Sequence, residues 1–454
     1  MSQYSVKFAF CALCMGFFMV ILDVTIVNVA LPSIAYYFHT TLSGLQWIVA
    51  GYTLTFAGLL LLVGGFCDYF GAKKIFKIGL ISFGLTSLGC ALSPTIAWLI
   101  FFRLLQGAAG ALLLPSSLAL ITHLYSEPDD RASAIGIWAA LGGVACASGP
   151  FLGGLLTSLF SWRLIFFINL LIGLVSLLLI CFYLKNLKAA NPKRKPFDFL
   201  GSISGFLFIF LLSYGLIEMG VYGWNNLIIM LCFIFSGLSL MLFLWIESRV
   251  SYPMLPLSLF RDRVTTMALL AAMILNLSFY GELFMLPFYF QNLRHYSVLM
   301  TGLAILPLPG LALMGSYLGG QLVAKIGSAN IIMIGFTITA IGFFSLLTLE
   351  QNFPDYIWIM LPFLVIGFGI SFATPAMTFA AIHSAKQPHA GIAAAVLNTV
   401  SQMGSLIGVA IFGTIATISK DFLWSMHITL FLAGIMFLVT AFLHLLLVRG
   451  KLLI

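Results

Sequence analysis

The stretch GGVACASGPFLGG, residues 142–154, holds five glycines and one proline within thirteen residues of a longer apolar segment. Glycine and proline both weaken an isolated helix, so their concentration here needs a physical reason. Lipid offers no hydrophobic drive for helix association, and small residues let two helix backbones approach closely. The stretch therefore predicts a tightly packed membrane-spanning helix, bent at Pro150, with Gly149, Gly153 and Gly154 on its contact face.

The composition of the whole chain requires a membrane. Of its 454 residues, 62% are hydrophobic and 7% are charged, and the mean hydropathy is +1.13. These values exclude a soluble globular domain. The apolar runs have the length of helices, which excludes a transmembrane barrel built from short alternating strands. The sequence predicts an all-α integral membrane protein.

Polar and turn-rich breaks divide the chain into fourteen predicted spans. The spans lie at 8–37, 45–67, 74–92, 96–123, 131–157, 162–184, 198–217, 226–246, 264–290, 298–324, 328–349, 355–381, 390–418 and 426–448. With the N-terminus in the cytoplasm, seventeen of the 21 lysines and arginines fall on the inner side and three on the outer side. This bias predicts that both termini are cytoplasmic, and it explains the net charge of +8 without a nucleic-acid partner.

The connections predict how the spans are grouped. The longest basic connection, KNLKAANPKRKPF at 185–197, follows the sixth span, and a mixed charged and apolar segment occupies 247–263. We expect a six-helix bundle at 1–184, then a part at 185–263 with the basic linker, two extra spans and an interfacial segment, and a second six-helix bundle at 264–454.

Two internal echoes support a duplicated bundle. GGFCDYFG at 64–71 and GQLVAKIG at 320–327 each hold two glycines seven residues apart. GAAGALLLP at 107–115 and GFGISFATP at 367–375 each place a glycine eight residues before a proline. Both echoes fall at the offset that a duplication requires, and many transporters are built from such repeats.

Several motifs resemble those of the major facilitator superfamily. Residues 145–154 are similar to its antiporter motif GxxxGPxxGG, with Ala145 in place of the first glycine. The other matches are LDVTIVNVALP at 22–32, GGFCDYFGAKK at 64–74, RLLQGAAGA at 103–111 and WRLIFFIN at 162–169. Together they identify the chain as a member of the fourteen-helix drug:proton antiporter-2 family. The resemblance implies two rocking bundles, a central cavity, and a monomer in the bacterial cytoplasmic membrane that exports small organic molecules against entering protons.

Three ionisable residues lie well inside predicted spans: Asp23 in the first, Arg103 in the fourth and Glu282 in the ninth. A charge at the bilayer centre costs about 3 kcal/mol, so each needs a partner or a task. Asp23 and Arg103 are predicted either to form a static ion pair or to bind and release a proton; the family resemblance implies the second role. Glu282 has no motif. It could be a second proton site, a hook for cationic substrates, or a polar residue near the outer rim.

The loop motif predicts a cytoplasmic gate. Asp68 ends the second span beside Gly71 and Lys73, and Arg131 opens the fifth span on the same side. Asp68 is either a solvated loop charge or, as the motif implies, a charge latch with Arg131 as its partner. In the tenth span, Pro307 and Pro309 indicate a hinge, although a static kink would give the same sequence.

The chain lacks the sequence patterns that an enzyme or an ATP-driven pump requires. The chain holds no HExxH, GxSxG or paired-carboxylate pattern for an enzyme and no GxxxxGK[ST] loop for ATP. Its seven cysteines lie almost wholly in apolar stretches, so neither a metal nor a cofactor is expected. The sequence predicts a proton-coupled exporter of lipophilic or cationic compounds. The alternative is a dedicated exporter of one metabolite, such as a siderophore or a peptide-like product.

Overall fold

The computed structural model describes residues 3–184, 198–250, 253–350, 355–383, 390–419 and 421–447. Within these ranges the chain forms helices joined by turns and short loops, without a β-strand. The α-helices are α1 (Gln3–Phe38), α2 (Leu42–Phe70), α3 (Ala72–Ala91), α4 (Ile96–Leu124), α5 (Pro128–Leu159), α6 (Leu164–Tyr183), α7 (Phe199–Tyr222), α8 (Leu227–Arg249), α9 (Arg263–Phe288), α10 (Val298–Ile305), α11 (Pro307–Gly310), α12 (Ala312–Ile326), α13 (Ser328–Ser345), α14 (Ile357–His383), α15 (Ala390–Ile418) and α16 (Phe422–Leu447). Three single turns of other helix types are η1 (Leu257–Arg261), η2 (Tyr289–Leu293) and η3 (Leu346–Thr348).

The all-α membrane fold is confirmed. Thirteen helical stretches in the described ranges are long and apolar enough to cross a membrane, and α2, with 29 residues, occupies the remaining predicted span. Local capping explains several helix starts: the side chain of Thr41 begins α2, Thr95 begins α4 and Asn226 begins α8, each accepting a backbone N–H of the first turn. The basic connection predicted at 185–197 lies outside the described residues.

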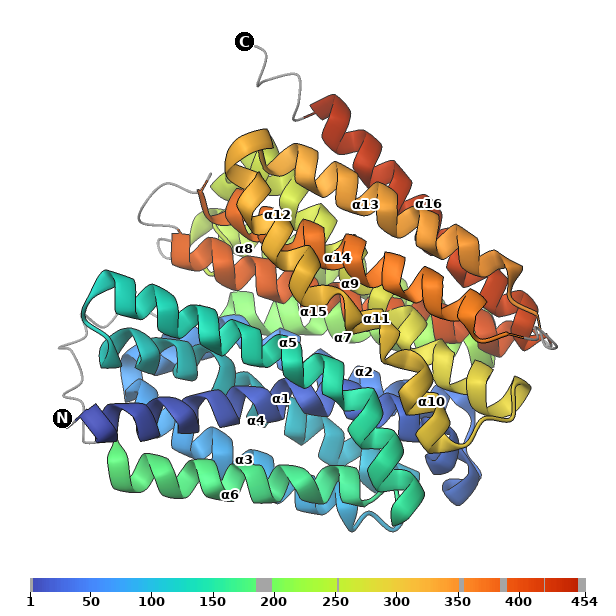
Figure 1. Ribbon diagram of the computed structural model, residues 1–454, viewed down its shortest axis with the longest axis horizontal. Coiled ribbons are helices and arrows are strands. Elements are labelled where there is room, and N and C mark those ends of the chain that lie inside the picture. Colours follow the sequence, from blue (N-terminus) through green and yellow to red (C-terminus); the bar gives the residue numbers. More distant parts are fainter. Residues whose placement is uncertain are drawn as a thin grey trace. The chain divides into compact units, whose positions relative to one another are not determined.

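The contacts divide the chain into two compact units. The first holds Met1–Phe206 with Ser297–Gly302, and the second holds Leu207–Tyr296 with Leu303–Ile454. In the first unit, α1 packs against α4, α5 and α6, while α3 packs against α4 and α6, and α2 against α4. In the second unit, α9 packs against α14, α15 and α16, while α13 packs against α14 and α16, and α12 against α14 (Figure 1).

The two units therefore repeat one order of helix partners. This repetition supports the interpretation that the chain contains two related six-helix bundles. The boundaries at 1–184, 185–263 and 264–454 remain a prediction.

The tenth predicted span is broken at its prolines. α10 ends at Ile305, α11 covers only Pro307–Gly310, and α12 begins at Ala312. Proline lacks a backbone N–H, and its ring collides with the preceding turn, so two prolines two residues apart interrupt the helical hydrogen bonds. The break is a property of the fold, whereas hinge motion at Pro307 and Pro309 remains a prediction.

Candidate functional site

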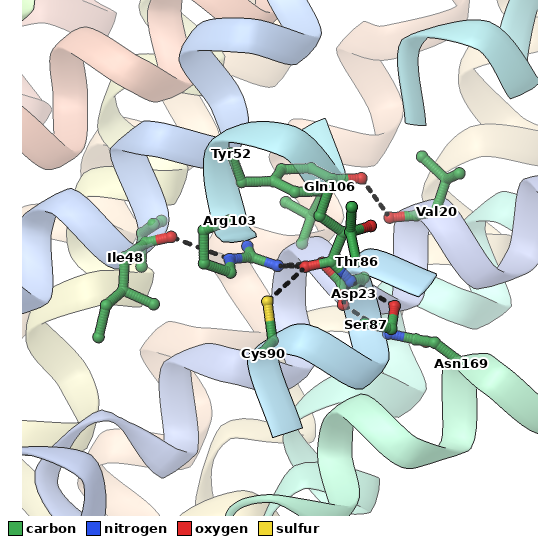
Figure 2. A network of polar contacts seen from close by, with 12 residues as sticks. Val20, Asp23, Ile48, Tyr52, Thr86, Ser87, Cys90, Arg103, Gln106 and Asn169 are labelled. Carbon is green, nitrogen blue, oxygen red and sulfur yellow. Dashed lines mark hydrogen bonds and ion pairs between the residues drawn. The ribbon is translucent and has the colours of Figure 1, made fainter. Parts of the chain in front are cut away.

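The first unit contains a buried ion pair between two of the predicted site residues. Arg103 of α4 donates from Nη1 to Oδ2 of Asp23 on α1. The two side chains are 1% and 0% exposed. Figure 2 shows the guanidinium and the carboxylate pointing toward each other between the helices. The structure thus brings together the charges that the sequence placed on separate spans.

The second oxygen of Asp23 accepts two further hydrogen bonds. Gln106 Nε2 of α4 donates to Asp23 Oδ1 over 3.0 Å, and Asn169 Nδ2 of α6 donates to the same atom over 2.6 Å (Figure 2). An ionised carboxyl group accepts hydrogen bonds and donates none. Three donors from two helices therefore hold Asp23 as a carboxylate, which Arg103 neutralises.

Arg103 is fixed by more than the ion pair. Its Nε donates to the carbonyl of Ile48 over 3.0 Å, and its Nη1 also donates to Gln106 Oε1 over 2.7 Å. The guanidinium carbon lies 4.4 Å from the ring centre of Tyr52, a cation–π distance. Gln106 Nε2 in turn donates to Ser87 Oγ of α3 over 2.8 Å. The network therefore joins residues of α1, α2, α3, α4 and α6.

The sequence did not predict three members of this network: Gln106, Asn169 and Ser87. A signal was present for the first, because Gln106 follows Arg103 by three residues and so shares its helix face. Asn169 ends the stretch WRLIFFIN, which the family resemblance had already singled out. Ser87 carries no local signal, because a serine in an apolar span usually bonds to its own helix.

The glycines of α5 make the close contacts that their spacing predicts. A Cβ atom on Gly149 would lie 3.0 Å from the backbone nitrogen of Ile26, and one on Gly153 would collide with the carbonyl of Ile26. α5 therefore packs directly on the backbone of α1, three residues beyond Asp23. Helix contacts of this kind need glycine on the approaching face.

A second side of α5 contacts the first turn of α10. A Cβ atom on Gly154 would lie 2.8 Å from the carbonyl of Val298, and one on Gly302 would collide with the carbonyl of Pro150. Pro150 lies inside α5. The antiporter-like stretch thus presents small residues to two helices at once.

The predicted gate includes Gly71 and Lys73, which lie near the start of α3. In the structure, Lys73 bonds to a backbone carbonyl outside the predicted latch. Gly71 links α2 to α3 with φ +87°, a conformation that glycine adopts without strain. Gly327 links α12 to α13 with φ +82°, so the first internal echo extends to backbone geometry. The ammonium group of Lys73 donates to the carbonyl of Leu184, the C-cap residue that follows α6.

Arg131 lies in the first turn of α5 and bonds to the connection that precedes this helix. Its Nε donates to the carbonyl of Tyr125 over 3.1 Å, and its Nη2 donates to the carbonyl of Ser126 over 3.0 Å. Asp68 lies in the last turn of α2, but its side chain is outside the described part of the chain. The Asp68–Arg131 latch therefore remains a prediction.

Glu282 belongs to the second unit and is not part of the Asp23 network. It lies on α9, is 4% exposed and lines a small cavity among apolar side chains. Neither carboxyl oxygen has a hydrogen-bond partner among the described residues. The side chain therefore lies in the interior of its unit. Its three predicted roles remain predictions.

In the described ranges, no group of histidine, cysteine, aspartate or glutamate residues could hold a metal ion. The site is instead a buried carboxylate with its counter-charge, next to a glycine-lined helix contact in an apolar bundle. Within membranes, such buried charges mark ion or proton pathways.

The family comparison agrees with this arrangement. A model of the Major Facilitator Superfamily matches residues 13–409. The chain belongs to the Major Facilitator Superfamily. The matched range includes the Asp23 network, the glycine face of α5 and Glu282. The protein is therefore a multi-pass membrane transporter and not an enzyme.

Named relatives refine the group within the superfamily. The methylenomycin A resistance protein of Bacillus subtilis is 36% identical over 409 residues, covering 90% of this chain and 87% of that protein. The multidrug resistance protein Stp of Mycobacterium tuberculosis is 33% identical over 88% of this chain and 74% of that protein. The tetracenomycin C resistance and export protein of Streptomyces glaucescens is 32% identical over 89% of this chain and 74% of that protein. These relatives confirm the resemblance to the drug-efflux family.

Solved structures show the same fold at low sequence identity. A bacterial homologue of the lysosomal transporter Spinster has a TM-score of 0.69 and 15% identity, covering 100% of this chain and 98% of that one. A variant of the nucleoside transporter NupG has a TM-score of 0.70 and 10% identity, covering 97% and 100%. Both share the overall fold of this chain.

Proposed function

We propose that this protein is a proton-coupled antiporter that exports small lipophilic or cationic organic compounds by alternating access. Membership of the superfamily and the resistance and efflux names of its relatives support export. The observation that carries the coupling is the ion pair of Asp23 and Arg103, buried where water cannot neutralise either charge.

Proton binding at Asp23 would break this pair. The neutral carboxyl no longer attracts Arg103, which is left as an uncompensated buried cation. Leaving one charge of a buried pair without its partner costs about 3–5 kcal/mol, enough to favour a different packing of α1 and α4. In the proposed cycle, Asp23 takes a proton from the outside, releases it to the inside, and substrate moves outward during the return.

The glycine face of α5 would serve as the moving contact. Gly149 and Gly153 add no side chain of their own where α5 meets Thr25 and Ile26 of α1, so the two helices can slide against each other. Gly154 does the same where α5 meets α10. Pro307 and Pro309 would act as the hinge. Movement of α1 against α5 could therefore follow directly from the charge change at Asp23, which lies on the same helix.

The cytoplasmic gate is proposed for Asp68, Gly71, Lys73 and Arg131. The bond from Lys73 to the carbonyl of Leu184 ties the α2–α3 turn to the end of α6, and so supports a gate that moves together with the first unit. The charge bias supports a cytoplasmic position for this end of the helices and for both termini in a bacterial cell. We propose a monomer, because each unit already pairs its helices internally.

The alternative is a narrow exporter of one metabolite, such as a siderophore or peptide-like product. The relatives named for methylenomycin A and for tetracenomycin C favour it, since each name specifies one compound. The coupling residues would be the same in both cases. A panel of substrates separates the two functions.

The test uses proteoliposomes that contain the purified protein and a panel of neutral and cationic dyes and antibiotics. An imposed pH gradient should drive transport of several compounds, and Asp23→Asn should abolish it. The matched control is Asp421→Asn, an exposed carboxylate that caps α16 and touches no site residue. Gradient-driven transport that persists undiminished in Asp23→Asn would remove Asp23 from the proton path. Transport of one compound alone would favour the narrow exporter.

A further inference from the structure

The two units contain the same set of positions around one carboxyl group. Gly107 of α4 approaches the carbonyl of Tyr52, and Gly367 of α14 approaches the carbonyl of Leu308. The glycine turns at Gly71 and Gly327 lie 256 residues apart, which is also the separation of Tyr52 and Leu308. These contacts fix which residues of the second unit correspond to those of the first.

Residues of the Asp23 network in the first unit correspond to residues that line the Glu282 cavity in the second unit. Counted from the glycine turns, Ser87 corresponds to Phe343 and Cys90 to Leu346. Counted from Gly107 and Gly367, Arg103 corresponds to Phe363 and Gln106 to Ile366. All four of these second-unit residues, together with Leu308 and Leu430, line the cavity that Glu282 faces.

The helix facing these positions also carries an acid in each unit. On α1 it is Asp23, which accepts hydrogen bonds from polar residues of α4 and α6, and Ser87 of α3 joins this network through Gln106. On α9 it is Glu282, which reaches the apolar residues of α13, η3, α14 and α16. The second unit thus keeps the carboxyl group and replaces its cationic and amide partners with phenylalanine, isoleucine and leucine.

This replacement decides the protonation of Glu282 in the observed conformation. The side chain is 4% exposed, and neither oxygen accepts a hydrogen bond from a described residue. The hydroxyl of Thr429 lies near Glu282, but its proton is donated to the carbonyl of Met426 over 2.9 Å. The lining contains no other ionisable side chain among the described residues. A carboxylate cannot be held there without a partner, so Glu282 is a neutral carboxylic acid that carries a proton.

The two acids are therefore in opposite states. Asp23 is ionised and paired, and Glu282 is protonated and unpaired. An ionised Glu282 requires water or a cation, and either one requires the surrounding helices to separate. Opening and closing this part of the second unit would release and rebind one proton at Glu282.

We propose that Glu282 is a second proton-binding site, so that two protons, one at Asp23 and one at Glu282, enter for each molecule exported. This inference rests on the proposed antiport function. In each cycle the Glu282 carboxylate binds a proton from the outer side and releases it to the inner side. No other bond is formed or broken.

The test is the substrate gradient at which net flux vanishes. Proteoliposomes are held at zero membrane potential with a pH difference of one unit and a neutral transported dye. Each proton contributes a factor of ten to the opposing gradient at balance, because about 1.4 kcal/mol corresponds to tenfold. The wild type should balance at a gradient of about 100-fold, and Glu282→Gln at about 10-fold. The balance point does not depend on how much protein is active.

The control is Ser278→Ala, which removes another buried and unpaired oxygen one turn earlier on α9 and should balance like the wild type. A wild-type balance at about 10-fold would overturn the inference without any variant. So would a Glu282→Gln protein that balances like the wild type, or one that loses only cationic substrates and keeps the wild-type balance for neutral ones. If instead the wild type shows no gradient-driven transport, or Asp23→Asn retains it, the proposed antiport mechanism fails.

Discussion

Replacing Arg103 by methionine is expected to destabilise the protein by about 3–5 kcal/mol, because it leaves the buried carboxylate of Asp23 without its counter-charge. The methionine fills most of the volume of the arginine stem, so packing loss contributes little. The hydrogen bonds from Arg103 to Ile48 and to Gln106 are lost as well. Asp23 keeps only the amide donors of Gln106 and Asn169.

The double variant Asp23→Asn with Arg103→Met separates the charge term from the packing term. Each single change leaves one buried charge unpaired, whereas the double change leaves none. The double variant should therefore recover about 2 kcal/mol or more relative to the sum of the two single changes. A matched control is Arg261→Met, which removes an exposed arginine from η1 and should change stability little.

The measurement is equilibrium unfolding in mixed micelles with an increasing fraction of denaturing detergent. Helicity and intrinsic fluorescence report the transition for the wild type, the two single variants and the double variant. Additive losses, with the double variant as unstable as the two singles combined, would refute the reasoning. They would mean that Asp23 and Arg103 do not depend on each other for their stability.

Two further predictions concern glycines. Gly153→Val should destabilise the α1–α5 contact by about 1–3 kcal/mol and stop export, because the added atoms collide with the backbone of Ile26. The control is Gly143→Val on the same helix. A Cβ atom there meets nothing within 4 Å, so stability and export should both stay unchanged. Thermal stability and dye export measured on the pair check this, and equal effects would contradict it. Gly71→Val should cost about 1–2 kcal/mol, since valine is strained at φ +87°. Gly71→Asn should cost about as much, because asparagine tolerates positive φ only near ψ of about +45° and Gly71 has ψ +129°. Thermal unfolding in which either variant is as stable as the wild type would exclude backbone strain as the cause.

The spans could be predicted because they depend on neighbouring residues. Hydropathy over some twenty residues decides whether a segment can cross the bilayer, and polar caps such as Thr41 and Thr95 decide where a helix begins. The glycines of the α5 stretch likewise predicted a close helix contact, and Pro307 with Pro309 indicated a kink or hinge in the tenth span. Hydropathy, helix capping and the effects of glycine and proline on a helix depend on the local sequence and not on which helix packs beside it.

The sequence showed that the buried charges need partners, but it did not show which residues complete the site. The cost of Asp23 and Arg103 in lipid required a partner for each, and proximity of the two was the simplest outcome. The sequence could not show that Gln106 and Asn169 complete the site, because they lie 83 and 146 residues from Asp23 along the chain. Their contact depends on how α4 and α6 rotate against α1.

Glu282 shows most clearly which properties follow from local sequence and which depend on tertiary packing. Its sequence neighbourhood leaves three roles open, since an acid in a span looks the same whether it faces a rim, a substrate or a core. Packing of α13, α14 and α16 places apolar side chains around it at the positions that hold the polar network in the first unit. Local sequence determines which segments enter the bilayer and which residues weaken or bend them. The partner of each buried charge is set by helix rotation and register, which depend on contacts between residues far apart in the chain.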